Sequence, residues 1–169
     1  MRLPLRTFSL ILMALSAVFA SADTLTVRTL FTEMPDTVIP YLSRNSRLDC
    51  IDFIDSKMKA EVTNEFGGKT ELTAISDDSL SLRLNEACRL DILLLPTVQP
   101  VDSISQVIAL VRNLNIEGRG QGVSVDYYSV HWRQLSDKPL LTETAERRMM
   151  KCLKQSNILN YIVEKLNKD

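Results

Sequence analysis

Apolar and polar residues alternate from Glu61 to Trp132, and this period of two constrains the fold more than any other feature of the chain. The clearest example is Leu80, Leu82 and Leu84, which are separated by single polar residues. Such alternation is typical of half-buried strands, and the pair Gly67-Gly68 suits a hairpin turn between two of them. We therefore predict an antiparallel meander of five to six strands in which sequence neighbours pair.

Segments with helical periodicity lie before and after the predicted strands. We expect a short helix from Thr37 to Leu42 and a longer one from about Arg47 to Ala60, with Ser46 as its N-cap. Two further helices close the chain, the second of them beginning near Ser156. We predict that the N-terminal and C-terminal helices pack on one face of the sheet. The expected fold is a single α+β domain over residues 23–169.

Two irregularities interrupt the predicted strands. Pro96 and Pro100 bracket a segment that we expect to be a loop, because proline cannot donate a hydrogen bond to a strand ladder. The apolar parity changes at Tyr127-Tyr128: Val125 precedes the change and Val130 follows it. One extra residue in a β-bulge would produce this change, so we predict a bulge there.

The N-terminal segment has the three parts of a secretory signal peptide. Met1 to Arg6 is basic, Phe8 to Phe19 is apolar, and Ala20-Ser21-Ala22 offers a cleavage site. The apolar run is shorter than the roughly 20 residues that a membrane-spanning helix needs. We therefore expect removal of residues 1–22, export to the periplasm or the cell exterior, and no stable membrane insertion of a mature chain that begins at Asp23. The alternative is an uncleaved membrane anchor.

Charge and cysteine pattern disfavour several classes of partner. The chain has 20 basic and 21 acidic residues, so it lacks the excess positive charge that favours nucleic acid. Neither C-x-x-C nor H-x-x-x-H occurs, and we predict no metal and no cofactor. We expect Cys50, Cys88 and Cys152 to be buried thiols. The alternatives are one disulfide, with no pair preferred, or a catalytic Cys88 that uses His131.

Four polar motifs have simple structural interpretations, as a turn, a hairpin loop and two solvated helix faces. The glycine-rich loop leads into a predicted strand, so it lacks the helix N-terminus of a phosphate-binding loop. We interpret Asp77-Asp78 as a turn and Gly118 to Gly122 as the hairpin loop. The two solvated helix faces are the series Asp49, Asp52 and Asp55 and the series Arg147, Arg148, Lys151 and Lys154.

One aromatic cluster is the candidate ligand-binding site. Tyr127, Tyr128, His131 and Trp132 fall within six residues. On a strand, Tyr128 and Trp132 share one face, where aromatic rings can stack on sugars or peptides. The same residues can equally fill a core beneath a helix. We identify no catalytic residue.

Several strings of this sequence resemble a family of small exported proteins from Bacteroidales that is catalogued as a domain of unknown function. The resemblance begins in FTEMPDTVIPYLSRNSRLDCIDF, Phe31 through Phe53. It continues in Ala60-Glu61-Val62-Thr63-Asn64, Asp78-Ser79-Leu80 and the segment from Tyr127 to Trp132. It implies a Gram-negative cell envelope as the location and assigns no catalytic residue.

Three functions remain open from the sequence. The first is a non-catalytic binding or interaction module for a protein, peptide or glycan partner in the envelope, through a sheet face, an edge strand or a shallow groove. The second is a small hydrolase with a site built from scattered carboxylates or from Cys88 and His131. The third is a carrier of an apolar ligand between sheet and helices.

Overall fold

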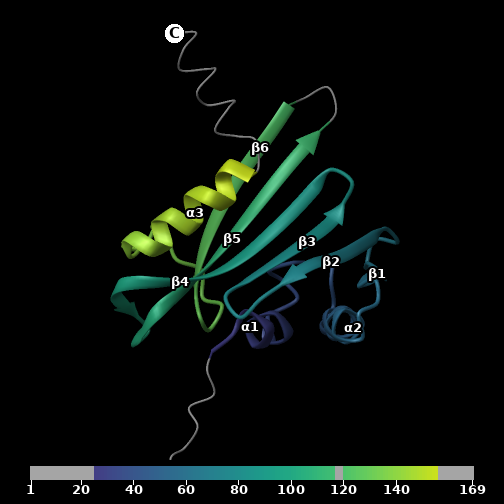
Figure 1. The fold of residues 1–169 in the computed structure, drawn as a ribbon, viewed down its shortest axis with the longest axis horizontal. Helices are drawn as coiled ribbons and strands as arrows, with labels where there is room; N and C mark the ends of the chain where they lie inside the picture. Colours follow the sequence, from purple (N-terminus) through teal and green to yellow (C-terminus); the bar gives the residue numbers. More distant parts are fainter. Residues whose placement is uncertain (1–24, 117–119, 156–169) are drawn as a thin grey trace, which may run out of the picture.

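The computed structural model describes residues 25–116 and 120–155. Nine helices and strands follow one another in these residues, and the predicted α+β class is confirmed (Figure 1). Their bounds are α1 Val27–Glu33, α2 Arg44–Asp55, β1 Glu61–Thr63, β2 Lys69–Ile75, β3 Ser79–Asn85, β4 Cys88–Val101, β5 Ile104–Ile116, β6 Gly120–Ser129 and α3 Glu143–Gln155.

The six strands form one antiparallel sheet in the order β1-β2-β3-β4-β5-β6, which confirms the predicted meander. The ladder is longest in the centre, where β4 pairs with β5 from Cys88 opposite Leu114 to Pro96 opposite Gln106. β4 continues through both prolines to Val101, so the predicted loop between them is wrong. The regular register does end at Pro96, because the ladder resumes only where Val101 faces Ile104.

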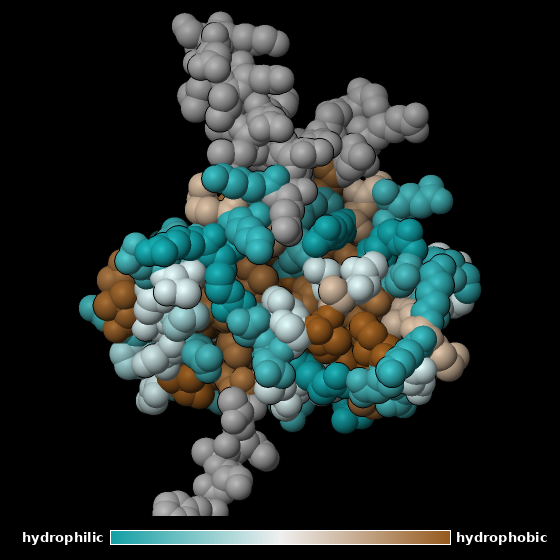
Figure 2. All heavy atoms as spheres, viewed as in Figure 1, coloured by the Kyte–Doolittle hydropathy of each residue, from teal (hydrophilic) through white to brown (hydrophobic). Residues whose placement is uncertain are grey.

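The helices cover both faces of the sheet, so our prediction of a single covered face is wrong. Leu94 packs in a core with α1 and α2, whereas its neighbours Leu93 and Leu95 pack in a second core with Ala145 and Met149 of α3. Consecutive residues of a strand point to opposite faces. α3 therefore lies on the face opposite α1 and α2 (Figure 1). Figure 2 shows that the α3 side is mainly hydrophilic, with separate hydrophobic patches.

The N-terminal helices differ from the prediction in position. The hydroxyl of Thr26 accepts a hydrogen bond from the Thr29 N–H, and α1 begins there instead of at Thr37. Residues 36–41 form turns that accommodate Pro40. α2 begins three residues earlier than predicted because Ser43 supplies the N-cap, and it ends before Lys57, whose φ of 57° is left-handed. The predicted helix after Ser156 lies outside the described residues.

The predicted bulge at Tyr127-Tyr128 is wrong. β5 and β6 pair without a register shift from Val107 opposite Ser129 to Ile116 opposite Gly120. Tyr127 contacts the α3 core and Tyr128 belongs to the core under α1 and α2. Both residues are therefore partly or fully buried on opposite faces, and the change in parity reflects two covered faces.

Candidate functional site

The structure divides the predicted aromatic cluster among three environments. Trp132 is 8% exposed, its Nε1 donates to the Leu30 carbonyl over 3.0 Å, and its ring lies 5.6 Å from that of Tyr128. His131 is exposed in the turn after β6, and Tyr127 is half-buried on the other face of the sheet. Tyr128 and Trp132 thus belong to the core, and only Tyr127 lines a surface groove.

The proposed Cys88 and His131 pair is not assembled. Cys88 lies opposite Leu114 at one end of the β4–β5 ladder. His131 follows Ser129, which lies opposite Val107, and Val107 in turn lies opposite Leu95. The seven residue-to-residue steps of the strand from Cys88 to Leu95 extend about 23 Å, too far for proton transfer between the thiol and the imidazole.

β6 is the last strand of the sheet in the described part of the chain, and some of its backbone groups point away from β5. The Tyr127 carbonyl accepts from the Leu135 N–H over 2.8 Å, and the Ser129 N–H donates to the Arg133 carbonyl over 2.9 Å. These backbone groups therefore point away from β5. The backbone N–H and C=O groups of Val123 and Val125 also point away from β5, because these valines alternate along β6 in step with Tyr127 and Ser129. Among the described residues, none bonds to the outward backbone of these two valines.

A groove of about 530 Å³ runs beside this edge. Its floor contains apolar side chains of the α3 face, and its outer wall is the segment that follows the bridge between Tyr128 and Gln134. Asp126 is paired with Arg112, and Lys138 is paired with Glu146. The lining residues are Val125, Asp126, Tyr127, Gln134, Leu135, Ser136, Asp137 and Lys138.

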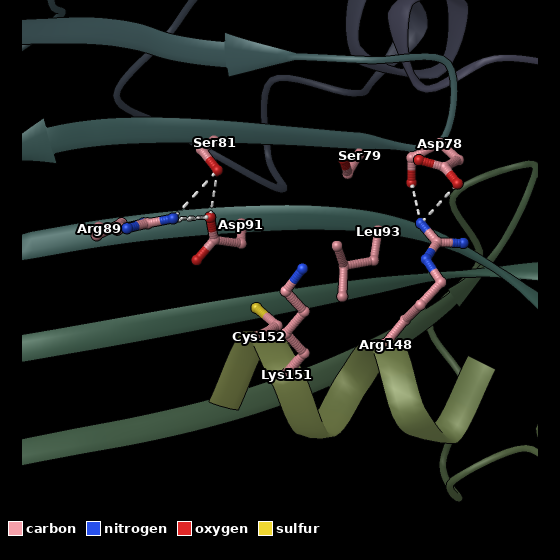
Figure 3. Close-up of a pocket in the computed structure, with 9 residues that line it drawn as sticks. All are labelled: Asp78, Ser79, Ser81, Arg89, Asp91, Leu93, Arg148, Lys151 and Cys152. Atoms are coloured by element: carbon pink, nitrogen blue, oxygen red, sulfur yellow. Dashed lines mark hydrogen bonds and ion pairs between the residues drawn. The ribbon is translucent and has the colours of Figure 1, made fainter. Parts of the chain in front are cut away.

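A second hollow, about 260 Å³ in volume, lies between α3 and strands β3 and β4 (Figure 3). At its floor is the carboxylate of Asp91, which is 4% exposed. This carboxylate accepts hydrogen bonds from Ser81 over 2.5 Å, from Arg89 over 2.9 Å and from Asn113 over 3.3 Å. Asp91 alternates with Leu90 and Ile92, a pattern typical of a solvated position, but α3 covers this face of β4. A polar lining of this kind does not suit an apolar cargo.

The three cysteines are reduced thiols in unreactive environments. Burial is the main cause that raises the pKa of Cys50 to about 11 and that of Cys152 to about 12, where Asp91 adds to the effect. Burial also raises the pKa of Cys88. A protonated thiol is a poor nucleophile, so these environments do not favour a cysteine hydrolase.

One of the four basic residues expected on a solvated face of α3, Arg148, has another role. Arg148 is half-buried, pairs with Asp78 over 2.9 Å and donates to the Leu94 carbonyl. Asp78 still lies in the predicted turn before β3. Lys151 and Lys154 are exposed and both line a hollow on the outer side of α3, and Lys151 also lines the edge of the polar cavity. Helical periodicity alone does not distinguish covered from exposed basic residues of α3, because their exposure depends on how the helix crosses the sheet.

Fold and site together define a small antiparallel-sheet α+β domain with an open edge groove and a charged cavity. In the described ranges, no three His, Cys, Asp or Glu side chains converge as metal ligands. Residues 19–169 match the family described as Protein of unknown function (DUF3256), and the chain belongs to this family. The match confirms the family resemblance found in the sequence.

A comparison of folds finds a similar domain in an uncharacterized protein from Porphyromonas gingivalis W83. The TM-score is 0.51 and the sequence identity is 16%, over 67% of this chain and 58% of that chain. At this identity the similarity concerns the fold alone. A search of curated proteins finds no match.

Proposed function

We propose that the protein is an exported, non-catalytic interaction module that binds an extended peptide segment of a partner along the free edge of β6. The observation that carries the proposal is the outward backbone of Val123 and Val125, to which no described residue bonds, beside an open groove. An exposed strand edge is a template for an added strand, and main-chain hydrogen bonds then supply the affinity.

The chain itself uses the first positions of this edge. Residues 133–135 pair antiparallel with the end of β6 through the bonds at Tyr127 and Ser129. Beyond Leu135, no described residue bonds to the next outward groups of β6, so we expect them to be available to another strand. A peptide that continues this short ladder toward Val123 would extend the sheet by one strand.

The side chains beside the edge indicate what the peptide presents. Val125, Tyr127 and Leu135 are half-buried residues that pack against the α3 core and line the groove. Alternate side chains of an added strand fall on the same face of the sheet. We therefore expect a peptide with apolar residues at every second position, which place their side chains against these three residues.

Replacing Val125 by proline tests the proposal. Proline removes an outward N–H and leaves the bonds between β6 and β5 intact, so the fold is expected to persist. Peptides are first selected from a displayed random library on the wild-type protein. We expect Val125→Pro to weaken their binding at least tenfold, measured by fluorescence polarisation.

Val125→Thr is the matched control, because threonine keeps the N–H and a β-branched side chain. We expect it to bind the selected peptides within about twofold of wild type, since its backbone donor is unchanged. Equal affinity of the proline and threonine variants for every selected peptide would show that the peptide does not pair with β6.

Export is part of the same proposal and rests on the N-terminal pattern. None of the helices in the described part of the chain is long and apolar enough to span a membrane. We expect the protein recovered from the envelope fraction of its native host to begin Asp23-Thr24-Leu25, as read by N-terminal sequencing. A chain that retains Met1 would contradict cleavage and favour the membrane anchor.

A further inference from the structure

The groove beside β6 contains more negative than positive charge among the described residues. Its lining includes two carboxylates, those of Asp126 and Asp137, and one ammonium, that of Lys138. Lys138 is paired with Glu146 over 2.7 Å, and Asp126 is paired with Arg112. Asp137 is exposed and forms no ion pair with a described residue. One negative charge at the groove is therefore left without a counter-ion.

The fold determines which positions of an added strand are available beside β6. Residues 133–135 bond to Ser129 and Tyr127, so the chain itself occupies this end of the edge. The next outward backbone groups belong to Val125 and Val123, and an added strand would place one residue opposite each of them. The residue between these two would lie opposite Ser124, whose side chain is exposed on the other face of the sheet.

The Asp126 carboxylate lies close to this middle position. Asp126 and Ser124 are two residues apart on β6, so their side chains point to the same face, the one that carries the core of α1 and α2. A residue opposite Ser124 is a diagonal neighbour of Asp126, at about 7–8 Å, which a long side chain can span. Asp126 is 30% exposed, its Oδ2 accepts from Arg112, and no described group donates to its Oδ1.

Arg112 approaches Asp126 from the interior of the sheet and not from the edge. It lies on β5 opposite Ser124, and its Nη2 donates to the Val38 carbonyl over 3.4 Å. Asp126 belongs to the edge strand, whereas Arg112 is one strand farther in. Of these two charges, the carboxylate is therefore the one that a long side chain from an added strand meets first.

We propose that the peptide bound along β6 carries a lysine or arginine opposite Ser124, between the apolar residues opposite Val125 and Val123, and that Asp126 determines this preference. The preference rests on the proposed function and adds the chemistry of the partner, a basic amphipathic strand. Asp137 adds an attraction for the whole peptide that decreases as salt screens it. An acidic residue at the same position would meet a carboxylate of like charge.

A double-mutant cycle on the full mature chain tests this preference. We expect peptides selected on the wild-type protein to be enriched in lysine or arginine between two apolar positions. One such peptide is compared with a version that has glutamine at that position, on wild type and on Asp126→Asn, by fluorescence polarisation at low salt. The basic peptide is expected to lose about fivefold in affinity on Asp126→Asn, and the glutamine peptide to stay within about twofold.

Asp102→Asn is the matched control, because Asp102 is also a partly exposed carboxylate paired with an arginine but does not line the groove. It is expected to leave both peptides within about twofold of their wild-type affinities. Selected peptides that do not respond to Val125→Pro would overturn the proposed function and this preference together. Peptides that do respond, but show no enrichment in basic residues or lose equally on Asp126→Asn with lysine and with glutamine, would overturn this preference alone.

Discussion

Replacing Arg47 by alanine is expected to lower the free energy of unfolding by about 3–5 kcal/mol. The Arg47 side chain is 1% exposed, although it belongs to a helix that the sequence marks as amphipathic. Its guanidinium donates to Asp36 over 2.7 Å, to the Leu42 carbonyl over 2.6 Å, and to the Met34 carbonyl. Alanine leaves these two carbonyls without a donor and opens a cavity. Urea denaturation measures the loss.

The variants Arg47→Lys and Asp36→Asn separate the causes. Lysine keeps the positive charge but lacks the planar fork that reaches three acceptors, so an intermediate loss is expected. Asp36 is 61% exposed, and its neutralisation is expected to cost about 1 kcal/mol or less. A free energy of unfolding of Arg47→Ala within about 1 kcal/mol of the wild-type value would show that the guanidinium does not hold the segment 34–42 against α2.

The strands were more predictable than the layers that cover them. Alternation at Leu80, Leu82 and Leu84 located β3 because its other face carries polar residues. From Leu90 to Leu95, six consecutive residues are buried, and local alternation cannot show which helix covers which face. The same ambiguity produced the false bulge at Tyr127-Tyr128. A chain with helices at both ends can place them on one face or on two, and only the packing of Ala145 and Met149 decides this.

The candidate sites depend on relations that a single sequence does not contain. The Tyr127 position was predicted, but that β6 is an edge strand follows from the order of the whole sheet. Asp91 alternates with apolar residues and therefore resembles a solvated position, although α3 buries it. Arg147 and Arg148 are adjacent arginines of α3, and only the crossing of the helix over the sheet separates the exposed Arg147 from Arg148, which lines the cavity. Long-range packing, which local periodicity does not specify, creates both sites.

Replacing Trp132 by alanine is expected to cost about 3–5 kcal/mol of stability, since the indole fills the core under α1 and α2. The substitution also removes the donor to the Leu30 carbonyl and the contact with the Tyr128 ring. The φ of Trp132 is 61°, and alanine keeps the Cβ atom that strains this left-handed conformation, so the substitution does not offset the loss. Urea denaturation measures the change in the free energy of unfolding, and the m-value is expected to stay unchanged.

Two milder variants decide whether this aromatic cluster is core or ligand surface. Trp132→Phe keeps a ring but loses the Nε1 donor, so we expect a loss of about 1–2 kcal/mol with unchanged affinity for the selected peptides. His131→Ala, at the exposed neighbouring position, is expected to stay within about 0.5 kcal/mol of wild type. The opposite pattern, in which Trp132→Phe keeps full stability and loses peptide binding, would make the indole a ligand contact. In that case the binding surface would extend from the groove beside β6 across its end to the α1 face.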